Sequence, residues 1–150
     1  MVVLDYGGGP KPFASVFLRA RKYRVFGTIR PFVDTGGPLT SLTPADVEKL
    51  HIPLNSLYGR TPRPSTHYIG GLSFWAYPME DVTLAIRDEN NKREEFILDS
   101  INVLKLTKND RESIARAREI PSILGMDFIT KNGFTLNFDP NNRIASLAKP

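Results

Sequence analysis

The chain contains, near the end of its first third, the segment Phe32-Val33-Asp34-Thr35-Gly36-Gly37-Pro38-Leu39-Thr40-Ser41-Leu42. Its apolar beginning predicts a buried strand. The glycines and the proline predict a tight turn, because glycine reaches positive φ freely and proline fixes φ. Asp34 thus ends a buried strand, where an ionised carboxylate is costly unless it is hydrogen-bonded or paired. Such a carboxylate is typical of a catalytic site, but an Asx turn, in which aspartate bonds its own backbone, explains the tripeptide Asp-Thr-Gly as well.

Two later segments extend this pattern. They are Tyr68-Ile69-Gly70-Gly71-Leu72, between two strand-like runs, and Pro121-Ser122-Ile123-Leu124-Gly125-Met126-Asp127-Phe128. With the Asp34 segment they make the sequence resemble the retropepsin-like aspartic proteases, the single-domain relatives of pepsin. In that family a Val-Asp-Thr-Gly turn is followed by a glycine-tipped flap, and a late Ile-Leu/Ile-Gly segment threads the active-site loop. The three motifs occur here in the family's order and span about residues 16–147.

The resemblance implies an all-β fold, a closed retropepsin-like acid-protease barrel with a flap hairpin and two or three short helices, in one domain over residues 1–150. The residues favour the same class, since alternating and turn-bounded runs predict strands over 13–19, 23–30, 81–87, 94–103, 134–138 and 143–147. Helices are predicted over 44–50, 108–120 and 125–131. The first has a capping box at Thr43 and Asp46, and the second has Asn109 and Glu112 as a cap. Residues 55–65 receive no assignment.

Composition indicates an ordinary globular chain. Of the 150 residues, 41% are hydrophobic and 24% charged, which suits one domain with a real core. No apolar run reaches membrane-spanning length and the apolar start is too short for a signal peptide, so we expect a cytoplasmic protein without membrane contact. The absence of cysteine excludes disulfides and thiol chemistry. The net charge of +4 and the basic run from Arg19 to Arg24 permit an acidic partner, but no nucleic-acid-binding motif accompanies them.

Peptide hydrolysis without a metal or a covalent intermediate needs a base for the water proton and an acid for the carbonyl. Two carboxylates that share one proton supply both, because two like charges so close cannot both ionise. The sequence has no second Asp-Thr-Gly or Asp-Ser-Gly, the nearest segment being Asp99-Ser100-Ile101. The resemblance implies a homodimer, since a two-fold interface brings Asp34 of both chains together. The predicted protein is a homodimeric aspartic endopeptidase that acts on a peptide or protein substrate.

The resemblance assigns roles to the residues around Asp34. Thr35 hydrogen-bonds across the dimer to the partner's turn, and Gly36 lets its backbone amide approach the carboxylate. Gly37 stands where the family usually has Ala, Ser or Thr, so one carboxylate oxygen lacks the hydrogen bond that a serine would donate. Leu39 indicates an apolar subsite.

The flap would close over the substrate with four residues, Tyr68, Ile69, Gly70 and Gly71. An ordinary hairpin turn explains these residues nearly as well. No cofactor or metal site is predicted. No histidine site is expected either, because nothing in the sequence places a carboxylate, a serine or a second ligand beside His51 or His67. Asp127 is interpreted as structural, either capping the short helix or pairing with an arginine.

Two other functions remain open. The first is a non-catalytic retropepsin-like dimer that binds extended peptides or builds an assembly, which Gly37 and the proline-rich stretch before the flap favour. The second is a basic interaction domain, which the charge favours and which would bind nucleic acid with steep salt dependence. No nucleic-acid partner is expected for the protease.

Overall fold

The computed structural model describes residues 1–6, 11–59 and 65–149. Its strands are β1 Val2–Val3, β2 Asp5–Tyr6, β3 Pro12–Phe13, β4 Val16–Ala20, β5 Val25–Ile29, β6 Phe32–Val33, β7 Ser41–Leu42, β8 Ser65–Ile69, β9 Leu72–Arg87, β10 Arg93–Leu106, β11 Ile123–Leu124, β12 Thr135–Asp139 and β13 Ile144–Ala148. Its helices are the 3-10 turn η1 Arg21–Tyr23, α1 Pro44–Lys49, α2 Leu54–Tyr58, α3 Arg111–Glu119 and α4 Met126–Lys131.

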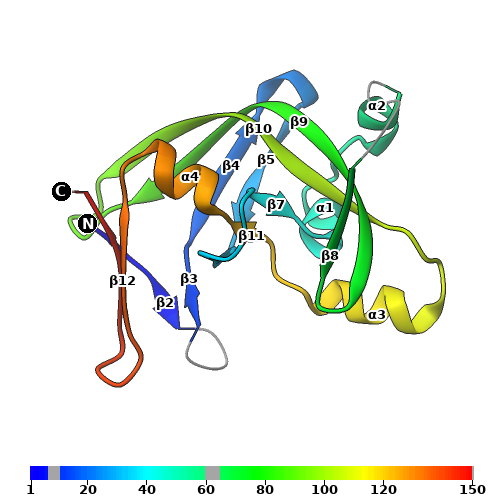
Figure 1. The fold of residues 1–150 in the computed structure, drawn as a ribbon. Coiled ribbons are helices and arrows are strands. Elements are labelled where there is room, and N and C mark those ends of the chain that lie inside the picture. The colour runs from blue at the N-terminus through cyan, green and yellow to red at the C-terminus, as the bar shows by residue number, and fades with distance from the viewer. Residues whose placement is uncertain (7–10, 60–64, 150) are drawn as a thin grey trace.

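The larger sheet is strongly curled. Its described strands follow the order β2-β3-β6-β11-β7-β10-β9-β4-β5, with β8 paired to β9. The two longest strands, β9 and β10, are antiparallel and arch over the top of the molecule in Figure 1. The prediction of a mostly β protein is confirmed, and the sheet forms a half-barrel. Closure of this half-barrel into a complete barrel stays a prediction.

Apolar residues on the inner face of this sheet form the core. The alternation that predicts a strand over 81–87 is confirmed, since Val82, Leu84 and Ile86 are all buried within β9. A second, smaller cluster lies at the other end of the same strand. This hairpin core consists of Leu72, Phe74, Ala76, Leu104 and Ala117, with Ile69, Leu106 and Ile120 packed against it. Because Ala117 belongs to α3, the hairpin core fastens the β8–β9 hairpin to that helix.

The capping box predicted at the start of α1 does not form. Thr43 is the N-cap residue and Pro44 follows it, but the Thr43 hydroxyl donates to the carbonyl of Ile120 at 2.7 Å. The Asp46 carboxylate accepts from the Ser122 hydroxyl at 2.5 Å. Both side chains therefore bond the segment before β11 in place of their own helix, and they tie α1 to that segment.

The helix predicted over 108–120 is also corrected at its start. It begins at Arg111, and its N-cap is Asp110, whose carboxylate accepts from the backbone N–H of Ser113 at 3.0 Å. The cap is thus not the predicted pair of Asn109 and Glu112. The hydrogen bonds from Ser113 hold the pKa of Asp110 below its usual value of 3.8. The unassigned stretch contains α2, while residues 60–64 lie outside the described residues.

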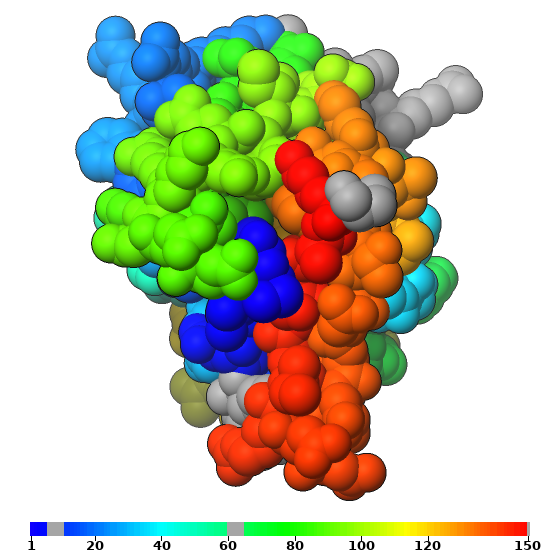
Figure 2. Space-filling view, turned by 90° about the vertical axis from the view of Figure 1, so that its left-hand side faces the viewer, coloured from blue at the N-terminus to red at the C-terminus, as the bar shows by residue number. Residues whose placement is uncertain are grey.

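The two ends of the chain pair with each other in the smaller sheet, whose order is β1-β13-β12. Val2 lies opposite Leu147, and the predicted hairpin of residues 134–147 is confirmed as β12 and β13. Figure 2 shows these segments side by side down one face of the molecule, with the N-terminal strand in blue and β12 and β13 in orange and red. This terminal sheet also exposes several large apolar side chains, namely Met1, Val3, Phe138 and Ile144.

Candidate active site

Asp34 directly follows strand β6 and lies at the edge of the core. Phe32 of this strand lies opposite Ile123 of β11 in a parallel pair, and Val33 is buried. The backbone N–H of Asp34 donates to the carbonyl of Leu124 at 3.1 Å, which extends the pairing by one residue. The strand then ends, and the half-buried Asp34 side chain stands at its tip.

The turn after the strand bonds the carboxylate itself. The backbone N–H of Gly36 donates to Oδ1 of Asp34 at 2.8 Å, and the N–H of Gly37 donates to the Asp34 carbonyl at 3.2 Å. A Cβ on Gly36 would stand 3.3 Å from that same Oδ1. The Asx turn that the sequence allows is therefore present. It fixes the carboxylate in one orientation, whether or not the residue is catalytic.

Gly37 leaves the other carboxylate oxygen open. A Cβ there would lie 3.3 Å from Oδ2 of Asp34 and 3.1 Å from Cγ2 of Ile123. Oδ1 has the Gly36 donor, but no group among the described residues donates to Oδ2. One oxygen is thus held, and the other has no donor within the described part of the chain, so a second chemical group would have to complete its hydrogen bonding.

Backbone hydrogen bonds from the segment after β11 hold this turn in place. The N–H of Met126 donates to the Gly37 carbonyl at 2.8 Å, and the N–H of Asp127 donates to the Pro38 carbonyl at 3.1 Å. Gly125 passes so close that a Cβ there would lie 2.6 Å from the carbonyl carbon of Leu39. The contact between the Ile-Leu-Gly segment and the Asp34 loop, which the resemblance implies, is confirmed.

The side chains of Thr40 and Asp127 add further hydrogen bonds between the turn and this segment, a pairing that the sequence did not predict. Oδ1 of Asp127 accepts from the backbone N–H and the hydroxyl of Thr40, at 3.0 and 2.7 Å, and from the N–H of Phe128. The Thr40 hydroxyl in turn accepts from the N–H of Gly125 at 3.1 Å. Asp127 makes structural bonds but in neither predicted way, since the N-cap of α4 is Gly125 and the acceptor atom of Asp127 bonds Thr40 and the N–H of Phe128. Its bonds to Thr40, 87 residues away, have no local signal in the sequence.

The Asp34 carboxylate borders a pocket of about 400 Å³. Its walls are largely apolar and its rim carries one lysine and one glutamate, and the lining residues are Lys11, Phe13, Phe32, Asp34, Ile69, Glu119, Ile120, Pro121 and Ile123. The pocket brings Asp34 together with Ile69 of the predicted flap. Other predicted substrate-binding residues do not line it. Of these, Leu39 and Tyr68 are exposed, with 45% and 77% of their surface accessible.

The predicted flap is a hairpin made by β8 and β9. Gly70 and Gly71 form its two-residue turn with φ of +58° and +77°, which only glycine adopts without strain. The guanidinium of Arg116 donates to the Gly70 carbonyl at 2.8 Å, and a Cβ on Gly70 would lie 3.4 Å from the side chain of Ile120. The hairpin tip therefore rests on α3. Movement of this hairpin as a flap stays a prediction.

The premise that no serine lies beside a histidine is wrong, although the serine that does so builds no site. The hydroxyl of Ser65 lies 3.2 Å from Nε2 of His67, two residues along the same strand and on the same face. No described residue bonds Nδ1 of His67, so nothing orients the ring as a catalytic base requires. Within the described residues, no group of three or more His, Cys, Asp or Glu side chains is placed to hold a metal ion. The helices of that part are all too short or too polar to cross a membrane.

Comparison with known proteins was made on sequence and on structure. No protein-family model matches the sequence, and no curated protein matches it. Among solved structures, a retropepsin-like aspartic protease from Rickettsia conorii matches with a TM-score of 0.54 and 20% identity, over 99% of this chain and 89% of that one. The chain has a retropepsin-like fold. EIAV protease, solved with the inhibitor HBY-793, matches this retropepsin-like chain with a TM-score of 0.45 and 15% identity, over 90% of this chain and 100% of the other.

Proposed function

We propose that the chain is a homodimeric aspartic endopeptidase in which one Asp34 from each protomer forms the catalytic pair. One observation carries the proposal. The Asp34 carboxylate is fixed through Oδ1 by the Gly36 amide, is open at Oδ2, and borders a largely apolar pocket under the tip of a hairpin. A rigid carboxylate with one unsatisfied oxygen is half of the acid–base pair that hydrolysis by a directly activated water requires.

The two carboxylates would share one proton, because two negative charges in contact cannot both persist. The ionised Asp34 takes a proton from the attacking water, and the protonated Asp34 donates to the carbonyl oxygen of the scissile bond. Thr35 is exposed beside Asp34, and in this proposal its side chain bonds the partner's turn. Ile69 would cover the substrate, and the apolar pocket walls favour an apolar substrate side chain next to the scissile bond.

The dimer is needed for the second carboxylate. Among the described residues, Glu119 is the other carboxylate that lines the Asp34 pocket, and it is exposed at the end of α3. Within residues 1–6, 11–59 and 65–149, no donor or partner holds Glu119 toward Asp34, so we assign the second role to Asp34 of a partner subunit. The exposed apolar side chains of the terminal sheet, such as Val3 and Ile144, offer a surface that a partner can cover.

The test is cleavage of a mixed peptide library at acidic pH. Wild type should cleave it, and Asp34→Asn and Asp34→Ala should not. Asp99→Asn removes an exposed carboxylate of the nearest similar tripeptide and should cleave normally. Cleavage that survives both Asp34 substitutions would contradict the proposal.

Mixing experiments test the dimer separately. If subunits exchange freely, an equal amount of Asp34→Asn chain should reduce the activity of a fixed amount of wild type to about one half, because a two-fold site needs both carboxylates. A site complete within one chain would keep full activity. In that case, loss of cleavage in Glu119→Gln would place the second carboxylate in the same protomer.

A non-catalytic peptide-binding dimer is the second candidate, and the open Oδ2 at Gly37 is what favours it. The family usually has Ala, Ser or Thr at that position, and a serine or threonine would supply a hydroxyl that this chain lacks. Under this alternative, the library peptides bind wild type without turnover at any pH.

A further inference from the structure

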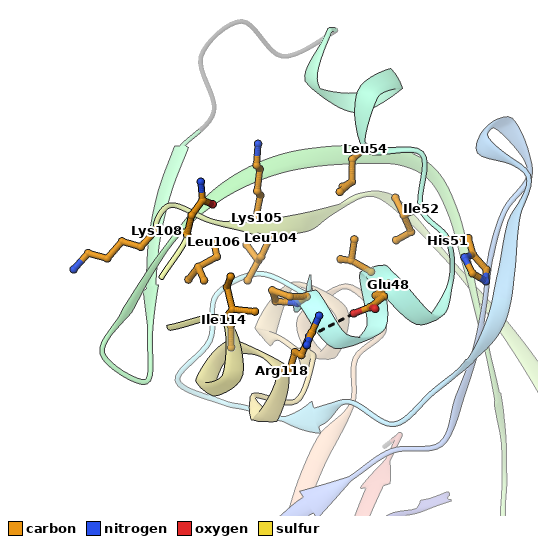
Figure 3. Close-up of a pocket in the computed structure, with 14 residues that line it drawn as sticks. Glu48, His51, Ile52, Leu54, Leu104, Lys105, Leu106, Lys108, Ile114 and Arg118 are labelled. Carbon is orange, nitrogen blue, oxygen red and sulfur yellow. Dashed lines mark ion pairs between the residues drawn. The ribbon is translucent and has the colours of Figure 1, made fainter. Parts of the chain in front are cut away.

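A second pocket lies beside α3 and shares no lining residue with the pocket of Asp34. It measures about 500 Å³ and is enclosed by α1, the last residues of β10, and α3. In Figure 3 the side chains of Leu104 and Leu106 reach from β10 toward Ile114 of α3. The apolar lining residues are Pro44, Val47, Ile52, Leu54, Leu104, Leu106, Ile114 and Ala117. A cavity of this size and polarity is typical of small-molecule sites.

The rim of this pocket carries an excess of positive charge. Its charged residues are Glu48, Lys105, Lys108 and Arg118, with His51 beside them. Glu48 and Arg118, both exposed at the rim, form an ion pair at 3.7 Å, drawn as a dashed line in Figure 3. This pairing leaves Lys105 and Lys108 as the surplus cations. Figure 3 shows both lysines directed outward from the apolar centre, Lys105 and Lys108 toward different sides of the opening.

Neither lysine is held by a carboxylate of the pocket. The amino group of Lys105 lies 4.6 Å from the centre of the Tyr58 ring, a cation–π contact that leaves its N–H donors free to bond an anion. Lys108 acts on Asp110, lowering the pKa of that carboxyl, but Asp110 is already engaged as the cap of α3. The pocket lining therefore includes two flexible lysines that can turn toward an anion, and neither is paired with a lining carboxylate.

We propose that this pocket binds a small amphipathic anion of the fatty-acid type. Its apolar body occupies the space between Leu104, Leu106 and Ile114, and its carboxylate lies at the rim with Lys105 and Lys108. A neutral body would fill the same space but would leave both lysines without a counter-charge, and a cationic head would be repelled. The proposal concerns residues apart from Asp34, so it holds or fails independently of the protease function.

The test is a titration of full-length protein with octanoate, 1-octanol and octylammonium, followed by the methyl NMR signals of isoleucine and leucine. Octanoate should move the methyl signals of the second pocket, while those of core residues that line neither pocket serve as the internal reference. The reporters of the second pocket are Ile52, Leu104, Leu106 and Ile114, and the reference residues are Leu18 and Leu147. Octanol should bind at least about fivefold more weakly than octanoate, the range expected for one or two exposed ion pairs, and this difference should shrink at high salt.

Variants separate the head from the body. Lys105→Gln with Lys108→Gln should weaken octanoate binding by about fivefold and leave octanol unchanged. The matched control, Lys92→Gln with Lys131→Gln, removes the same charge from exposed lysines outside the pocket and should leave both ligands unchanged. Ile114→Trp fills the cavity and should abolish binding of both.

Three results would overturn the proposal. One is octanoate moving only the reference methyls, and another is octanol or octylammonium binding as tightly as octanoate. The third is an equal loss of octanoate affinity in the control double variant. Should Ile114→Trp not fold, the salt dependence and the lysine variants still decide the outcome.

Discussion

Replacing Gly125 with alanine measures how firmly the turn of Asp34 is held. Gly125 has φ of −91° and ψ of −177°, an extended conformation that any residue adopts, so alanine there costs nothing in backbone strain. The added Cβ would, however, stand 2.6 Å from the carbonyl carbon of Leu39 and 2.8 Å from the carbonyl oxygen of Gly37. These are backbone atoms, so they move only if the whole loop moves. An ordinary contact at 3.4 Å requires a shift of about 0.8 Å, the difference between 3.4 and 2.6 Å.

The expected cost follows from that shift. Overpacking a well-packed site costs about 1–3 kcal/mol, and the upper end applies because two backbone atoms are displaced. The same shift stretches the hydrogen bond from the N–H of Met126 to the Gly37 carbonyl, now 2.8 Å long. We therefore expect the free energy of unfolding to fall by about 3 kcal/mol, or the Tm by about 6–12 °C for a chain of this size.

Thermal and urea unfolding of wild type, Gly125→Ala and Gly59→Ala provides the assay. Gly59 has φ of −64°, and a Cβ there would make an ordinary 3.5 Å contact with the Asn55 carbonyl, so alanine should be neutral or slightly stabilising. An unchanged urea m-value would show that the midpoints report stability alone. If Gly125→Ala unfolds within about 1 °C of Gly59→Ala, the loop is not locked as described and the reasoning is refuted.

Two further predictions concern α3. Arg116→Ala removes the bond to the Gly70 carbonyl and should raise amide hydrogen exchange at the hairpin tip about tenfold, with global stability changed by less than about 0.5 kcal/mol. Arg118→Ala, on the same helix, should leave that exchange unchanged, and equal effects would contradict the tip contact. The hydrogen bonds from Ser113 lower the pKa of Asp110 in the folded protein. The ionised cap therefore stabilises α3 fully at pH values above the ordinary pKa of 3.8, and this stabilisation is lost as the pH falls through the lowered pKa. Asp110→Asn should reduce the fall in the free energy of unfolding between about pH 4 and lower pH. If the fall is the same in wild type and Asp110→Asn, the cap is not its cause.

Sequence reasoning succeeded where the signal is local. The alternation of Val82, Leu84 and Ile86 depends only on which side of one strand faces the core, and each side chain is buried. The turn at Gly70 and Gly71 follows from the positive φ that both residues need. The loop at Asp34 was predicted for the same reason, since its glycines and its carboxylate bond one another within three residues.

It failed where a side chain had a distant competitor for its hydrogen bonds. Thr43 and Asp46 satisfy every local rule for a capping box, yet Ser122 and the Ile120 carbonyl, nearly eighty residues away, bind them instead. The interaction between Thr40 and Asp127 likewise cannot be predicted from the sequence, because no local pattern pairs two residues so far apart along the chain. Local propensity names residues that can cap or bond, and tertiary contacts decide which partner they take.

Helix α3 connects the features from which both proposals are argued. Glu119 at its end, with Ile120, borders the pocket of Asp34, while Ile114 and Ala117 line the second pocket. Between them, Arg116 holds the hairpin tip at Gly70. A ligand that moves α3 from one side therefore changes the wall and the cover of the pocket on the other. Binding free energies coupled in this way are reciprocal: any factor by which octanoate changes the affinity of a peptide at Asp34 must equal the factor by which that peptide changes the affinity of octanoate.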